Sequence, residues 1–188
     1  MTSCAFSENA EDYFNKGKEK RNKGDLDGAI EDFTKAIELK PDSASSYNNR
    51  GLAKCDKMEL DGALADYTKA IELRPDQAIA YNNRGNVKVY KGDLNGAIMD
   101  YTRAIELKPD FFNPYNGRGA ARTDKGEWDD AVMDLNQAIK LEPNDSVSYN
   151  TRGAVRLLKR ELSNAITDFT KAIELKPNHY EEIGRAHV

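Results

Sequence analysis

Small and bulky apolar residues alternate with polar ones in a pattern that repeats every 34 residues from Ala10 to His179. When Ala10 is counted as the first position, glycine fills the eighth position of every unit and alanine the twentieth. Tyrosine fills the fourth position, and an aromatic residue or leucine fills the twenty-fourth. Small side chains at matched places allow two antiparallel helices to cross closely, and bulky ones fill the space beside the crossing. The pattern therefore predicts five helix–turn–helix units, at residues 10–43, 44–77, 78–111, 112–145 and 146–179.

A unit of this length cannot bury its own apolar face, so it is stable only when it stacks on its neighbours. A third column of alanine, at the twenty-seventh position, is expected to receive the first helix of the following unit. We therefore expect an all-α solenoid of ten helices, with a leader at residues 1–9 and a tail at 180–188.

The last residues of the tail need a separate interpretation. Ile183–Val188 reads IGRAHV, which matches the translation of a widely used sequencing adapter. We interpret this segment as adapter read-through and expect the natural protein to continue past Glu182. A short natural tail is the alternative.

Glycine, aspartate and proline mark the ends of the expected helices. Gly24 and Asp25 supply a left-handed residue and then an N-cap between the two helices of the first unit. Met58 and Arg160 take the place of that glycine in two other units. A left-handed backbone at a residue with a side chain costs roughly 1 kcal/mol. Proline ends each second helix, and the Asp or Asn that follows it is expected to cap the next helix.

Charged residues also recur with the repeat. The seventh position is always cationic, and an aspartate always stands sixteen residues later. The cations are Lys16, Arg50, Arg84, Arg118 and Arg152, and the carboxylates are Asp32, Asp66, Asp100, Asp134 and Asp168. Because both charges recur in every unit at the same spacing, we predict a half-buried ion pair in each unit. A cationic stripe that binds an acidic partner is the alternative. The eleventh position is also basic, without an evident partner.

The small–small–proline columns, together with the aromatic fourth and twenty-fourth positions, resemble the tetratricopeptide repeat. The segments YNNRG and GAI-DYTKAIEL-P look like repeats common in bacterial members. The resemblance extends over all five units. It implies a right-handed superhelix whose first helices line a concave groove, and a non-enzymatic scaffold that binds a protein or an extended peptide there.

The positions that face the groove in this family carry many asparagines here. A carboxamide can donate to a peptide carbonyl and accept from a peptide N–H, so stacked amides can hold an extended peptide. The row resembles the asparagine ladder in the repeats of O-linked N-acetylglucosamine transferases, although there it uses the sixth and ninth positions. The candidate amides are Asn48, Asn49, Asn82, Asn83, Asn86, Asn116 and Asn150, and the candidate apolar anchors are Tyr90, Leu157 and Leu158. Solvated amides that bind nothing are the alternative for the row, and packing against a further repeat is the alternative for the two leucines.

Composition argues against other kinds of partner. The formal net charge of −4 leaves no excess of cations for nucleic acid, and no apolar run is long enough to span a membrane. Cys4 and Cys55 have no metal-binding spacing, and a cytoplasm that keeps both thiols reduced fits them best. No catalytic or cofactor-binding motif is present. We therefore expect no enzyme activity, no cofactor and no metal.

Two further possibilities remain open from the sequence. The repeats fit a regulatory or substrate-recruiting region of a larger enzyme, a kinase or glycosyltransferase, truncated after about residue 182. The last repeat also lacks a polar closing helix, which predicts that its second helix exposes Ile166, Phe169 and Ile173 and can drive self-association.

Overall fold

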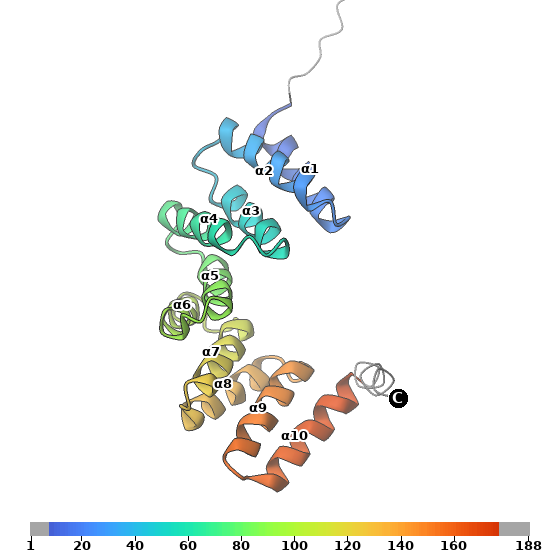
Figure 1. Cartoon of the computed structure of the whole chain (residues 1–188), viewed down its shortest axis with the longest axis vertical. Coiled ribbons are helices and arrows are strands. Elements are labelled where there is room, and N and C mark those ends of the chain that lie inside the picture. The colour runs from blue at the N-terminus through green and yellow to red at the C-terminus, as the bar shows by residue number, and fades with distance from the viewer. Residues whose placement is uncertain (1–7, 177–188) are drawn as a thin grey trace, which may run out of the picture. The chain divides into compact units, whose positions relative to one another are not determined.

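The structure is a computed structural model that describes residues 8–176, and every regular element in that range is an α-helix (Figure 1). The helices are α1 (Ala10–Asn22), α2 (Leu26–Leu39), α3 (Ala44–Asp56), α4 (Leu60–Leu73), α5 (Ala78–Tyr90), α6 (Leu94–Leu107), α7 (Phe112–Asp124), α8 (Trp128–Leu141), α9 (Ser146–Leu158) and α10 (Leu162–Leu175). The predicted all-α helical-repeat class is confirmed. The adapter-like end, Cys4 and His179 lie outside the described residues.

The chain divides into two compact units between Lys91 and Gly92, in the turn between α5 and α6. In the first unit α1 packs on α2, α2 on α3, α3 on α4 and α4 on α5; in the second the same succession runs from α6 to α10. The odd-numbered helices of each unit also contact one another, α1 with α3, α3 with α5 and α7 with α9. Neither α2 with α4 nor α8 with α10 makes such a contact within the described helices. We call the face formed by α1, α3 and α5, and the face formed by α7 and α9, the odd-helix surfaces of the two units.

Close crossings inside the helix pairs explain the glycine and alanine columns. A Cβ added at Gly51 would lie 2.8 Å from the ring of Tyr67, so no side chain fits there. Ala63, opposite on α4, is fully buried. Ala70 packs in one cluster with Ala80 of the next pair, as expected for the third alanine column. Each small residue therefore marks a place where one helix rests on another.

The predicted turn conformations are confirmed. Gly24 has a positive φ of 82°, and the Asp25 side chain accepts a hydrogen bond from the Gly28 N–H at 3.0 Å. Met58 and Arg160 adopt the same left-handed region, with φ of 63° and 62°. Their Cβ atoms make this conformation sterically unfavourable, whereas glycine adopts it in the other turns without a clash.

The predicted caps after proline are wrong. Each of the helices α3, α5, α7 and α9 has its N-cap two residues after the proline, one residue later than expected. Ser43 and Asp145 cap through their side chains, whereas Gln77 and Phe111 make no side-chain capping bond. The residue next to proline precedes the cap, so it is not the residue that satisfies the first free N–H groups.

The ion-pair prediction is confirmed where the seventh position is Arg50, Arg118 or Arg152. Arg50 donates from Nε and Nη2 to Asp66 at 2.9 and 2.6 Å, and from Nη1 to Thr34 of the preceding helix pair at 3.1 Å. It therefore joins three helices. The missing partner of the eleventh position is the same aspartate, because Lys54 Nζ lies 2.8 Å from Asp66.

The first repeat, residues 10–43, departs from this pattern. Lys16 pairs with Glu8, which precedes α1, and not with Asp32 as predicted. Asp32 instead pairs with Lys20, whose Nζ lies 2.7 Å from Oδ2. A lysine presents a single ammonium group, so Lys16 cannot make the forked contact with aspartate that Arg50 makes.

Candidate functional site

Three of the predicted amides form a connected row on the odd-helix surface of the first unit. Asn82 Nδ2 lies 3.4 Å from Asn83 Oδ1, and Asn83 Nδ2 donates to Asn48 Oδ1 at 3.2 Å. The row passes from α5 to α3, because the fifth and sixth positions of consecutive repeats face each other across neighbouring odd helices. We call Asn48, Asn82 and Asn83 the amide row.

The amide row keeps hydrogen-bonding capacity at both ends. Asn48 is half-buried, and its Nδ2 makes no hydrogen bond within residues 8–176. Asn82 is only 6% exposed, and its Oδ1 is buried without a partner in the same range. A buried acceptor without a partner costs free energy, so an N–H that reaches it is favoured. The row thus offers a donor at Asn48, and it holds beneath its surface an acceptor at Asn82 that lacks a partner among the described residues.

The remaining predicted residues of the first unit lie on the same surface but outside the row. Asn49 donates to the Ser45 carbonyl of its own helix at 2.9 Å, which occupies its amide locally. Asn86 is exposed on α5, and Tyr90 is 68% exposed at the end of that helix. Tyr90 is therefore accessible as an apolar contact.

The second unit has a different arrangement. Asn116 Nδ2 lies 3.4 Å from the carboxylate of Asp145, the N-cap of α9. Asn150 is exposed on α9. Leu157 and Leu158 are 50% and 51% exposed at the end of the same helix. This surface therefore combines amides at one end with apolar side chains at the other.

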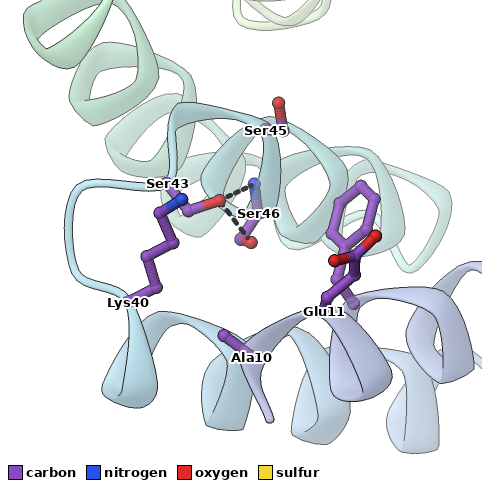
Figure 2. Close-up of a pocket in the computed structure, with 7 residues that line it drawn as sticks. Ala10, Glu11, Lys40, Ser43, Ser45 and Ser46 are labelled. Carbon is purple, nitrogen blue, oxygen red and sulfur yellow. Dashed lines mark hydrogen bonds between the residues drawn. The ribbon is translucent and has the colours of Figure 1, made fainter.

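A pocket of about 230 Å³ opens between the starts of α1 and α3 in the first unit (Figure 2). Ala10, Glu11, Phe14, Lys40, Ser43, Ser45 and Ser46 line it. Sequence reasoning missed it, because a search for amides passes over Phe14, the one residue in the fifth column that is not asparagine. The phenylalanine in a column of asparagines was the sequence feature that could have indicated the pocket. Lys40 comes from the end of α2, which no column of the odd helices predicts.

Two exposed aliphatic residues were also missed. Ile79 on α5 is 57% exposed and Val147 on α9 is 51% exposed. Both occupy the second position of their repeats, where the other three repeats carry Glu11, Ser45 and Asn113. They extend the apolar part of each odd-helix surface.

Within residues 8–176, no group of three or more His, Cys, Asp or Glu side chains is placed to hold a metal ion. No helix in that range is both long and apolar enough to cross a membrane. Burial raises the pKa of the Cys55 thiol, the nearby charge of Asp56 raises it further, and Arg21 opposes the shift. This thiol is therefore less reactive than an ordinary cysteine.

The described architecture is that of a protein-interaction repeat domain. The sequence matches the "TPR repeat" family at residues 17–57, 54–89 and 85–123, and the "Tetratricopeptide repeat" family at 147–179. The chain belongs to the tetratricopeptide-repeat family. No curated protein matches the sequence.

Solved structures of the same fold include a MamA protein, with a TM-score of 0.77 and 26% identity over 92% of this chain and 94% of that chain. YrrB, described as a TPR protein with an unusual peptide-binding site, has a TM-score of 0.72 and 20% identity over 96% and 93%. PilF of Pseudomonas aeruginosa has a TM-score of 0.81 and 18% identity over 88% and 75%. At this level of identity YrrB and PilF show likeness of fold alone.

Proposed function

We propose that this chain is a non-enzymatic scaffold that binds an extended peptide segment of a partner protein on its odd-helix surfaces. The observation that carries the proposal is the amide row, which holds three carboxamides together and leaves the Asn48 donor and the buried Asn82 acceptor without a partner in residues 8–176. An extended peptide backbone presents carbonyls and N–H groups, which are the complementary partners.

Hydrogen bonds alone do not supply useful affinity. Each contributes about 0.5–1.5 kcal/mol net, and association costs at least about 4 kcal/mol in lost translational and rotational freedom. Exposed apolar residues on the same surfaces supply the remainder: Ile79 and Tyr90 in the first unit, and Val147, Leu157 and Leu158 in the second. Asn49, Asn86, Asn116 and Asn150 complete the proposed contact set.

Self-association through α10 is a second contact that we propose. Ile166 and Ile173 are 66% and 47% exposed, and Leu162 is 59% exposed. The corresponding residues of α2, including Ile30 and Ile37, are at least half-buried beneath α3. The outer face of α1 does not suit this role, because Glu19 stands where later repeats bury Ala53, Val87, Ala121 and Val155. We therefore favour pairing of two α10 faces over head-to-tail growth. A cytoplasmic setting is part of the proposal on separate grounds, because two cysteines without metal-binding spacing fit a compartment that keeps thiols reduced.

The test begins with a peptide selected from a random phage-displayed library on the whole protein. Its Kd is then measured for the wild type, for Asn48→Ala, for Asn83→Ala and for Glu72→Ala, a control on the exposed side of α4. We expect each asparagine substitution to weaken binding about threefold to tenfold and the control to leave it unchanged. Equal affinity in all four proteins would reject the proposal.

A further inference from the structure

The pocket between α1 and α3 has the size of one amino-acid side chain. Its volume of about 230 Å³ is below the roughly 300–1,000 Å³ of sites that hold whole small molecules. It lies on the odd-helix surface of the first unit, because Glu11 and Phe14 come from α1 and Ser45 comes from α3. It is therefore suited to a side chain of a peptide that already lies on that surface.

The serines of the pocket are occupied with each other. Ser43 Oγ accepts from the Ser46 N–H at 3.3 Å, and the two hydroxyl oxygens lie 2.8 Å apart, as Figure 2 shows. These bonds cap α3 and leave those two hydroxyls little capacity for a ligand. The Ala10 side chain and the Phe14 ring supply apolar surface. The interior thus favours an apolar group.

The rim carries one charge of each sign. Lys40 and Glu11 lie on either side of the pocket in Figure 2, at the end of α2 and in the first turn of α1. Neither side chain makes an ion pair with a described residue, and both are exposed. A peptide that passes over the pocket therefore meets an ammonium group on one side and a carboxylate on the other.

We propose that this pocket binds one apolar side chain of leucine or phenylalanine size from the bound peptide, flanked by an acidic residue at Lys40 and a basic residue at Glu11. The inference rests on the proposed function and names the kind of peptide that the first unit selects. Phe14 makes the pocket particular to the first repeat, since the other repeats have asparagine at the same position: Asn48, Asn82, Asn116 and Asn150.

Phe14 also has a structural role, which the test must distinguish from its proposed role in binding. Its ring centroid lies 5.9 Å from that of Phe33, and Phe14 packs against the cluster of Ala29, Phe33 and Ala53. Phe14→Asn is therefore the variant of choice, because it introduces the residue that the other four repeats carry at this position. A helical circular-dichroism spectrum like that of the wild type establishes that it is folded.

The first experiment probes the pocket without a peptide. N-acetyl-leucinamide and N-acetyl-serinamide are titrated into the ¹⁵N-labelled whole chain. We expect the leucine compound to shift the backbone amides of Ala10, Phe14 and Ser46, and the serine compound to leave them in place. Phe14→Asn is expected to lose the shifts. Absence of shifts at these three amides in the wild type would overturn the inference, whatever longer peptides do.

The second experiment tests the flanking charges and separates this inference from the proposed function. Fluorescein-labelled peptides carry Lys-Leu-Glu, Glu-Leu-Lys or the corresponding serine-centred triplets in one Gly-Ser background. We expect one leucine-centred order to bind about tenfold or more tighter than its serine form, and Phe14→Asn to remove the difference. Exchange of the rim charges, in the double variant Glu11→Lys and Lys40→Glu, is expected to make the other order preferred. If all peptides bind alike and only Asn83→Ala weakens them, the pocket is rejected and the peptide-binding scaffold stands.

Discussion

Arg118 donates two parallel hydrogen bonds to Asp134, from Nε to Oδ2 at 2.9 Å and from Nη2 to Oδ1 at 2.6 Å. Arg122, one turn further along α7, donates a third to Oδ2 at 2.7 Å. Arg118 also reaches Thr102 of α6 at 2.9 Å, so one buried carboxylate and its arginines connect two successive helix pairs. The ion pairs of the repeat therefore act between repeats as well as within them.

Removal of this carboxylate is expected to destabilise the second unit strongly. Asp134 is 4% exposed, so Asp134→Ala leaves two guanidinium groups without their buried partner. We expect the free energy of unfolding in urea to fall by about 3 kcal/mol or more. Glu174→Ala, which breaks the exposed Lys171–Glu174 pair, is the matched control and is expected to cost less than about 1 kcal/mol. Equal losses in the two variants would contradict the assignment of a structural role to Asp134.

Glycine at the Met58 turn is expected to stabilise the protein. Met58 has a φ of 63° and a side chain that is 65% exposed, so its replacement removes steric strain and little packing. Met58→Gly is expected to raise the free energy of unfolding by about 1 kcal/mol. Met58→Ala keeps a Cβ and is expected to bring no such gain. A thermal denaturation series that ranks alanine with glycine would show that the backbone carries no strain there.

The Cys55 thiol is expected to react slowly in the folded protein. Burial raises its pKa, so less of the reactive thiolate is present at pH 8 than in an unfolded chain. Since folding favours the neutral thiol, the corresponding stability is present below the ordinary pKa and is lost as pH rises through the higher folded value. Iodoacetamide labelling, quantified on the Cys55 peptide by mass spectrometry, measures the rate with and without urea. Labelling that is as fast in the native protein would refute the shift.

Self-association is expected to depend on α10. Light scattering of the wild type at rising concentration is expected to show a mass that grows toward a dimer. Ile166→Glu places a charge in the proposed contact and is expected to weaken association about tenfold or more. Met133→Glu is the control, because Met133 is 69% exposed on α8, away from that face. A wild type that stays monomeric throughout would remove α10 from the list of contacts.

The repeat could be predicted from the sequence because its main packing contacts recur at the same spacing of 34 residues. The residue at Gly51 must be small because Tyr67 crosses it there, and Gly17, Gly119 and Gly153 meet the same requirement at the same place in their repeats. The second cation on Asp66, Asp134 and Asp168 was missed, although Lys54, Arg122 and Arg156 stand at a constant spacing of twelve residues before them. The sequence shows the constant spacing, but it does not show that the basic eleventh position contacts this aspartate.

The candidate site was less predictable, because it depends on which neighbours meet across helices. The columns placed Asn48 and Asn83 on one surface, but not the bond that joins them or the unused groups at each end. Asn116 turned out to lie near Asp145, a cap in the next repeat. The pocket combines Phe14 with Lys40, whose place at the end of α2 follows from packing and not from periodicity.

A peptide backbone that lies along the amide row must alter the surroundings of its three carboxamides, so the side-chain resonances of Asn48, Asn82 and Asn83 report such binding. We expect a saturating amount of the phage-selected peptide to shift these three NH₂ signals, and the side-chain amide of Gln77 at the start of α5 to stay in place. Shifts confined to α2 and α4, with the three asparagine signals unmoved in the fully bound protein, would show that the peptide does not bind at the amide row.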